Sequence, residues 1–355
     1  MHCLLGRRVR LLVGLAFTLL AALAGARTAK AETILPYTTI TTPTTWTLAG
    51  SPYILTGDVD VWASLTIEPG VVVKFAANKQ MLISKDGTLT AVGTAAQPIV
   101  FTSNAASPQP GDWGYVYFKP GSSGEIAYCD ISYGGIQDAW AQVYIDGTSN
   151  VTVRDCRIHD GATDGIRLYT SGEIIRPTLR NLVIENNAMV AINANSVVVQ
   201  PVYDNLTLRN NGRNGVALGW PNDNGGATLG KQLTLDGRGL NGAPFFFSTG
   251  LSIDASAALT VTPGTELRFS QDQQLYVSGR LVAVGTAAQP ITFTAMTTPP
   301  QPGDWKGLHF RFGSSGELAQ CDIGYGGRQR DEWSQLYIET SALTVSNCRI
   351  HHGGA

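Results

Sequence analysis

Short triplets, in which two apolar residues flank a variable one, recur through the middle of the chain at a nearly constant interval. They begin at Cys129, Cys156, Leu182, Leu206 and Leu233, so successive steps are 27, 26, 24 and 27 residues. Alternation of apolar and other positions is typical of a β-strand with one buried face. A strand that returns every 24–27 residues predicts a solenoid whose coils stack on one another.

A second set of strand-like triplets alternates with the first set and steps at a similar interval. Its members are Val143–Ile145, Ile166–Leu168, Ile192–Ala194 and Val216–Leu218. Turns rich in Asn, Asp and Gly separate the two sets. No amphipathic helix of about ten or more residues interrupts the pattern, which excludes βαβ crossovers. We therefore expect parallel strands that are connected by winding the chain around itself.

The chain also contains an internal duplication. Residues 91–135 are repeated 192 positions later with 30 of 45 positions identical and no gap. We expect a Thr-rich lead-in or cap at 32–54, a first copy at 55–250 and a second copy at 251–355. The second copy stops where the first still has about three coils to run, so we expect it to be C-terminally incomplete. Its open last coil predicts either a monomer or end-to-end association.

The repeat unit resembles a known family. Leu182 and Leu206 each begin the pattern L-x-I/L-x-N-N, and the pattern G-I/V-x-L occurs at Gly165 and Gly215. This pattern is similar to the right-handed parallel β-helix repeat of the pectin-lyase-like superfamily. The resemblance implies an all-β, right-handed parallel β-helix with roughly 24–27 residues per coil. The superfamily includes polysaccharide lyases, glycoside hydrolases and non-enzymatic repeat proteins, so the resemblance alone does not transfer an activity.

The N-terminus has the form of a secretory signal peptide over residues 1–31. Three arginines precede an apolar run at 11–24, and a small-x-small cleavage site ends at Ala31. We expect an exported protein without a membrane span. Removing this segment leaves 20 basic and 27 acidic side chains, a net charge of −7. Such a surface disfavours nucleic acid as a partner.

Four cysteines occupy equivalent inward positions in pairs, Cys129 with Cys156 and Cys321 with Cys348. An exported protein permits disulfides between neighbouring coils. In-register parallel strands instead place the two Cβ atoms side by side, which favours a ladder of buried thiols. Both alternatives stay open. A pair of thiols supplies too few ligands for a metal ion, so we expect no metal site.

Charged residues outside the inward positions form a ladder, with Asp130 over Arg157. A second column on successive coils contains His159, Glu185, Arg209 and Asp236. Cross-strand ion pairs explain this ladder without a substrate. The densest acidic group gives the weak catalytic candidates Asp155, His159, Asp160, Asp164 and Arg167. Turn chemistry accounts for most of the Asp residues in it.

Aromatic residues that recur in both copies give an alternative binding site. The candidates are Trp113, Tyr133, Trp140 and Tyr144, with their counterparts Trp305, Tyr325, Trp333 and Tyr337. Aromatic rings stack on sugar C–H faces, and two sites on one rod would gain avidity for a polymer. The same rings also suit a structural role in sealing coil edges.

The first hypothesis is a secreted, non-catalytic rod that needs no cofactor and binds a polysaccharide or another cell-surface polymer, or acts as a spacer. The alternative is a polysaccharide lyase or glycoside hydrolase. A lyase of the resembled superfamily would need Ca²⁺ held by clustered carboxylates against an acidic sugar. A hydrolase would need two or three acids from neighbouring strands.

Overall fold

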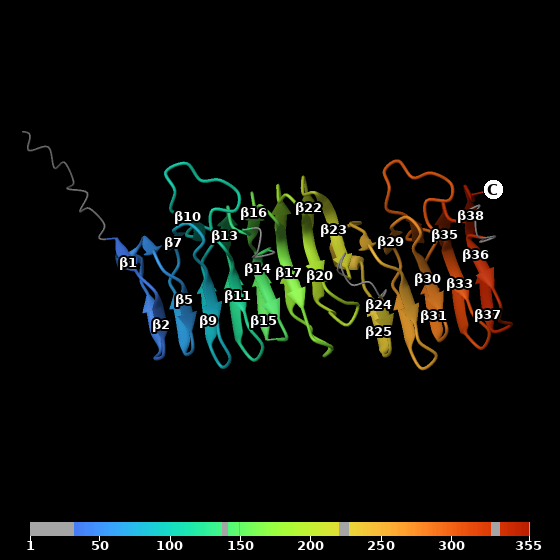
Figure 1. The fold of residues 1–355 in the computed structure, drawn as a ribbon, viewed down its shortest axis with the longest axis horizontal. Helices are drawn as coiled ribbons and strands as arrows, with labels where there is room; N and C mark the ends of the chain where they lie inside the picture. The colour runs from blue at the N-terminus through green and yellow to red at the C-terminus, as the bar shows by residue number, and fades with distance from the viewer. Residues whose placement is uncertain (1–31, 137–140, 149, 220–226, 328–333, 355) are drawn as a thin grey trace, which may run out of the picture. The chain divides into compact units, whose positions relative to one another are not determined.

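The computed structural model describes residues 32–136, 141–148, 150–219, 227–327 and 334–354. These residues belong to one compact unit and consist almost entirely of short strands (Figure 1). The strands pair in parallel with strands of the coils before and after them, because the chain winds around a common axis. The expected parallel β-helix is confirmed.

Three sheets form the first copy. The first sheet consists of β1 (Thr33–Leu35), β4 (Tyr53–Leu55), β7 (Val72–Phe75), β10 (Ile99–Ser103), β13 (Cys129–Ser132), β16 (Arg157–His159), β19 (Val183–Glu185) and β22 (Thr207–Arg209). The third sheet consists of β3 (Thr44–Trp46), β6 (Ser64–Ile67), β9 (Thr88–Val92), β12 (Ser123–Ala127), β15 (Val151–Arg154), β18 (Thr178–Arg180) and β21 (Val202–Asp204).

The second sheet runs through both copies. It consists of β2 (Thr38–Ile40), β5 (Val59–Val61), β8 (Met81–Ile83), β11 (Val116–Phe118), β14 (Ala141–Asp146), β17 (Asp164–Tyr169), β20 (Val190–Ala194), β23 (Arg213–Leu218), β26 (Phe245–Phe247), β29 (Glu266–Phe269), β32 (Ile291–Ala295), β35 (Cys321–Gly324) and β38 (Arg349–His351).

Two further sheets complete the second copy. The fourth sheet consists of β24 (Ala227–Leu229), β27 (Leu251–Ile253), β30 (Gln274–Val277), β33 (Gly307–Phe310) and β36 (Leu336–Ile338). The fifth sheet consists of β25 (Gln232–Leu235), β28 (Ala258–Val261), β31 (Arg280–Val284), β34 (Ser315–Ala319) and β37 (Leu343–Ser346). The short 3-10 helices η1 (Leu48–Gly50) and η2 (Arg238–Leu240) are the helical elements of the described residues.

A continuous apolar core fills the inside of the coil. In β7, Val73 and Phe75 are fully buried while Val72 and Lys74 are partly exposed, as strand alternation requires. One cluster of buried side chains extends from Ile40 to Ile323. Inward residues therefore stabilise the coil, and outward residues remain available for other roles.

The winding begins earlier than the strand pattern of the sequence indicates. That pattern starts near Leu55, and 32–54 reads as a lead-in. In the structure β1, β2 and β3 already occupy 33–46 and pair with β4, β5 and β6. Thr-rich strands lack the apolar alternation that marks the later coils, which is why the sequence pattern misses them.

The second sheet crosses from one row of strands to another between the copies. Equivalent strands β10 and β32 are 22 strands apart, and 22 is not a multiple of the three strands in a coil. β10 accordingly belongs to the first sheet and β32 to the second. Figure 1 shows the second sheet moving from the middle row of labels at β20 to the upper row at β29. The loops after β10 and β32 consequently rise from the same edge (Figure 1).

This crossing overturns two expectations about the fifth apolar triplet. Leu233 and Leu235 lie in β25 of the fifth sheet and do not continue the column that ends at Leu208. Asp236 likewise does not follow Arg209, and it pairs with Arg238 at 2.6 Å. The physical reason is that the first sheet ends at β22, so no strand of that sheet receives the next coil.

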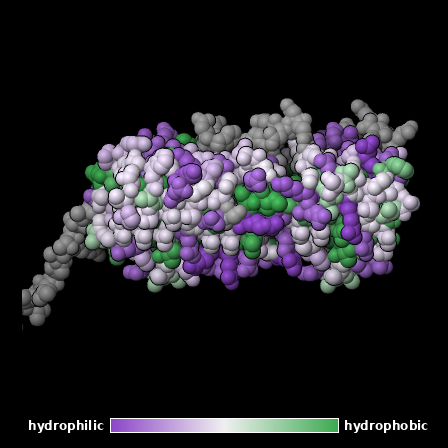
Figure 2. Space-filling view, turned by 90° about the horizontal axis from the view of Figure 1, so that it is seen from below, coloured by the Kyte–Doolittle hydropathy of each residue, from purple (hydrophilic) through white to green (hydrophobic). Residues whose placement is uncertain are grey.

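The side of the rod seen in Figure 2 carries no broad apolar patch. Hydrophobic side chains gather there in small, separate groups among hydrophilic and neutral ones (Figure 2). Scattered apolar side chains of this kind are ordinary on a protein surface and do not mark a binding site by themselves.

Candidate functional site

The outward face of the first sheet brings charged side chains of successive coils together. Strand register places Arg157 beside Asp130, and it places Glu185 between His159 and Arg209. These neighbours agree with the charge ladder expected from the sequence. They divide into two groups, which are joined through β16.

The first group is an acid–histidine cluster of Asp130, His159 and Asp160. The imidazole of His159 has Nε2 at 3.0 Å from Oδ1 of Asp130 and Nδ1 at 2.7 Å from Oδ2 of Asp160. Burial alone would lower the pKa of His159, but hydrogen bonds to the two carboxylates raise it. The cluster therefore favours a charged imidazole between two acids.

The second group is an arginine–glutamate chain of Arg157, Glu185 and Arg209. The carboxylate of Glu185 accepts hydrogen bonds from Nε of Arg157 at 2.7 Å and from Nε of Arg209 at 2.5 Å. The bonds from Arg209 and Arg157 hold the pKa of Glu185 below its usual range. The charges next to the acid–histidine cluster are therefore paired with each other.

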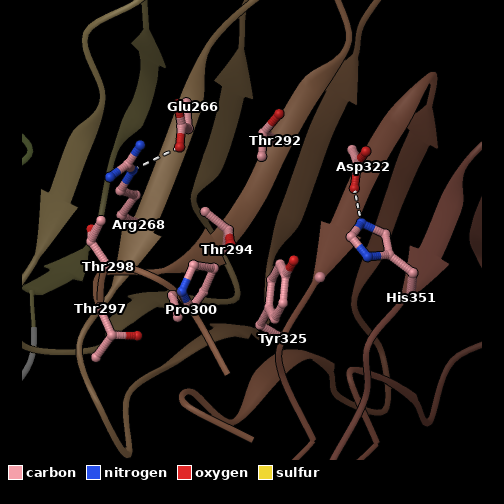
Figure 3. Close-up of a pocket in the computed structure, with 12 residues that line it drawn as sticks. Glu266, Arg268, Thr292, Thr294, Thr297, Thr298, Pro300, Asp322, Tyr325 and His351 are labelled. Atoms are coloured by element: carbon pink, nitrogen blue, oxygen red, sulfur yellow. Dashed lines mark hydrogen bonds and ion pairs between the residues drawn. The ribbon is translucent and has the colours of Figure 1, made fainter. Parts of the chain in front are cut away.

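The equivalent place in the second copy is hollowed (Figure 3). The hollow has a volume of about 290 Å³ and lies over β29, β32 and β35. Arg268 pairs with Glu266 at 2.7 Å on one side, and Asp322 pairs with His351 on the other. Two ion pairs therefore face each other across the hollow (Figure 3).

The second sheet of the first copy carries a different feature, an outward column of tyrosines. Tyr117 and Tyr144 occupy neighbouring register positions, and their rings stack at 4.5 Å with an interplanar angle of 10°. The hydroxyl of Tyr117 donates to Asp146 at 2.8 Å. The guanidinium of Arg167 lies 5.8 Å from the Tyr144 ring centroid. Burial, together with the charge of Asp146, raises the pKa of Tyr144 to about 12, so the hydroxyl stays protonated.

A matching column occurs on the fourth sheet of the second copy. Tyr276, His309 and Tyr337 occupy successive register positions. His309 meets both tyrosine rings edge-on at 4.8 Å. Glu339 lies 3.5 Å from Nε2 of His309, much as Asp146 lies beside Tyr117. We call these two groups the tyrosine columns.

Comparison with known protein families gave two matches. The pectate-lyase-like β-helix domain matches residues 38–139, and the right-handed β-helix region matches residues 91–225. These matches agree with the parallel stacked sheets. The chain is a parallel β-helix repeat protein. A right-handed sense agrees with the second matched region. Comparison with curated proteins and with solved structures gave no match.

The β-helix encloses two of the aromatic candidates completely. Trp113 stacks on Phe75 at 4.1 Å and donates its Nε1 hydrogen to the carbonyl of Ser132. Trp305 stacks on Phe269 at 4.7 Å and donates to Gly324 in the same way. A fully buried ring offers no face to a sugar, so for this pair the structural alternative is favoured.

The other aromatic candidates are distributed over two places. Tyr144 and Tyr337 belong to the tyrosine columns. Tyr133 and Tyr325 instead lie beside the histidines, with ring centroids 6.4 Å from His159 and 5.7 Å from His351. The remaining two, Trp140 and Trp333, lie outside the described residues.

The five weak catalytic candidates do not form one group. Asp155 lies at the corner between β15 and β16, with Arg154 at 2.8 Å and Asn181 at 2.9 Å. Asp164 and Arg167 lie on β17 in the second sheet. His159 and Asp160 meet at 2.7 Å. Asp130, which hydrogen-bonds to His159, was assigned by the sequence to a structural ladder. The strand register pairs Asp130 with Arg157, and only the side-chain geometry shows that it reaches His159.

The cysteines of the β-helix are free thiols in the structure. The backbone N–H of Cys129 points to the sulfur of Cys156 at 3.3 Å, as expected for stacked positions. Burial raises the pKa of the Cys129 thiol, and it raises that of Cys321 to about 12. Buried, protonated thiols react slowly, in keeping with the ladder alternative.

No group of three or more His, Cys, Asp or Glu side chains within the described ranges is placed to hold a metal ion. In that same part of the chain no helix is long and apolar enough to cross a membrane.

Proposed function

We propose that this β-helix is an exported, non-catalytic rod that binds a glycan polymer through its two tyrosine columns. The observation that carries the proposal is the stacked pair Tyr117 and Tyr144 with its counterpart around Tyr337. Tyr144 and Tyr276, which have neighbouring strands on both sides, are partly exposed. Aromatic faces held by a rigid sheet can contact sugar C–H surfaces at small entropic cost.

The arrangement of the columns supports a polymer as the ligand. β11 and β32, which mark the two equivalent coils, are seven strands apart in the second sheet, a distance of about 34 Å along the rod. Both columns lie in the middle row of strands in Figure 1. Weak sites at a fixed separation on one scaffold favour a long repetitive ligand over a small one.

Electrophoresis through gels that contain dissolved polysaccharides would test this proposal. We expect Tyr144→Ala and Tyr337→Ala each to reduce retention, and the double variant to lose it by about tenfold or more, because avidity needs both columns. Tyr37→Ala is the matched control, since Tyr37 is exposed between β1 and β2 outside the columns. Unchanged retention in the double variant, or no retention of the unaltered protein, would contradict glycan binding by the tyrosine columns. The protein would then be better described as a structural spacer.

One observation favours a second candidate function, cleavage of a glycan. Asp130 and Asp160 flank the imidazole of His159, and acid–base cleavage of a glycosidic bond needs two such acids near one bond. A polysaccharide lyase with Ca²⁺ remains the other form of this candidate. Release of reducing ends or unsaturated products, with loss in Asp130→Asn and His159→Gln, would establish the enzyme. Absence of products would support the binding rod.

A further inference from the structure

The hollow of the second copy has a regular construction. β32 lies between β29 and β35, with Thr292 in register with both Glu266 and Asp322. The outer strands are therefore two strand spacings apart, about 10 Å. Threonine side chains on the middle strand are short, whereas Glu266 and Arg268 on one side and Asp322 with His351 on the other extend further. The hollow forms because longer side chains on both sides project beyond the threonines of β32.

The charges that border the hollow balance each other. On the β29 side, Glu266 accepts from Nε of Arg268. On the β35 side, Asp322 pairs with His351 and has Arg349 at 3.6 Å. The lining therefore holds two carboxylates, one guanidinium and one imidazole, and the guanidinium of Arg349 lies beside Asp322 outside the lining. Such a border attracts neither a polyanion nor a polycation, but it offers many hydrogen-bond donors and acceptors.

An apolar wall closes one side of the hollow. Tyr325 and Pro300 line it below the two threonines of β32 in Figure 3. The Tyr325 ring stacks on His352 at 4.9 Å with an interplanar angle of 7°, which fixes its orientation. A hollow that combines a fixed aromatic face with charged hydrogen-bonding groups suits a ring with one apolar face and a rim of hydroxyl groups.

We infer that the hollow of the second copy binds one neutral pyranose unit. The floor hydroxyls of Thr292 and Thr294 and the carboxylates of Glu266 and Asp322 hydrogen-bond to the sugar hydroxyls, and Tyr325 contacts its C–H face. The volume of about 290 Å³ is small for a ligand pocket, which fits a single ring. This site lies over β29, β32 and β35, whereas the tyrosine columns lie on β11 and β14 and on β30, β33 and β36.

The first copy has the same strands with different side chains at two of these positions. Val72 replaces Glu266, and Val100 replaces Thr292, whereas Asp130 and His159 match Asp322 and His351. The pair Val72 and Val100 shows that valines are compatible with these strands. Substitutions toward valine therefore remove the proposed contacts while keeping a backbone and packing that the protein already uses.

Ligand-observed NMR with methyl glucopyranoside, methyl mannopyranoside and methyl glucuronide, each at millimolar concentration, tests the inference. We expect a neutral pyranoside to bind, Thr292→Val to weaken it about fivefold, and Glu266→Val with Thr292→Val to weaken it about tenfold or more. Thr207→Val on the exposed first sheet is the matched control and should change nothing. A urea midpoint equal to that of the unaltered protein shows that each variant is folded.

Three outcomes would overturn the assignment. Absence of binding by all three pyranosides would do so, and so would equal binding by the double valine variant. Stronger binding of the glucuronide would contradict the neutral class. The variant with both Tyr144→Ala and Tyr337→Ala separates this inference from the proposed function. It should lose polysaccharide retention yet keep pyranoside binding, and loss of pyranoside binding there would place the sugar in the columns.

Discussion

The two copies of the duplication carry the same aspartate–histidine pair on equivalent strands, yet the pair has different surroundings. In the first copy Val72 and Val100 occupy the two strands that precede the strand of Asp130. In the second copy Glu266 and Thr292 occupy the equivalent strands and line a hollow beside Asp322. One scaffold position thus borders two valines in one copy and a polar hollow in the other.

This difference indicates that outward residues determine what each coil can bind, while inward residues maintain the fold. Inward positions keep the same aromatic stack in both copies. Outward positions change from Val72 and Val100 to Glu266 and Thr292 without a change of strand pairing. A coil can therefore acquire or lose a binding surface at low structural cost, because its stability depends on the core and on the hydrogen-bonded ladder.

The largest expected effect tests whether the two cores are in fact equivalent. Trp113→Ala and Trp305→Ala should each lower the free energy of unfolding by about 3–5 kcal/mol, because each removes a fully buried stacked ring. Urea unfolding followed by circular dichroism measures both. A much smaller loss for Trp305→Ala would show that the second copy is packed differently from the first.

The sequence predicted the scaffold well, because its signal is periodic. Cys129, Cys156 and Leu182 repeat the inward position at the coil interval, and the register of β13, β16 and β19 follows from them. The duplication identified Trp113 and Trp305 as equivalent. It did not show that both point inward, because a tryptophan after a turn has no strand alternation to orient it.

The crossing of the second sheet and the binding surfaces were not predictable in the same way. Leu233 has the right spacing, but the first sheet ends at β22 and Leu233 lies on β25 of the fifth sheet. The link from His159 to Asp130 needs a side-chain geometry that spans 29 residues. The hollow depends on the short Thr292 between longer neighbours, which no single stretch of sequence reveals.

The pH dependence of stability sharpens the comparison, because the first copy buries the acid Asp164 on β17. Asp164 accepts hydrogen bonds from the backbone of Val190 at 3.2 Å and from Asn193 at 2.9 Å. Burial raises its pKa to about 6 from a usual value of 3.8. The folded state therefore holds this proton more tightly than the unfolded chain does.

Stability should consequently be highest below pH 4 for this group and fall as the pH rises to 6, by about 3 kcal/mol. Asp164→Asn should remove this fall, because an amide does not titrate. Urea midpoints measured from pH 4 to pH 7 compare the two proteins. If the stability of Asp164→Asn fell as much as that of the unaltered protein, another group would cause the fall. Asp164 would then not distinguish the first copy from the second.

The smallest expected effect concerns the arginine–glutamate chain of Arg157, Glu185 and Arg209 in the first copy. Glu185→Gln should lower the free energy of unfolding by about 2 kcal/mol, because its carboxylate is buried and accepts from two arginines. Glu266→Gln in the second copy is the matched control and should cost less than about 1 kcal/mol, because Glu266 is more exposed and pairs with one arginine. Equal losses in urea unfolding would mean that the arginine–glutamate chain does not stabilise the first copy more than a single pair stabilises the second. The two copies would then differ in the shape of this surface, and the ion pairs of Glu185 and Glu266 would contribute equally to stability.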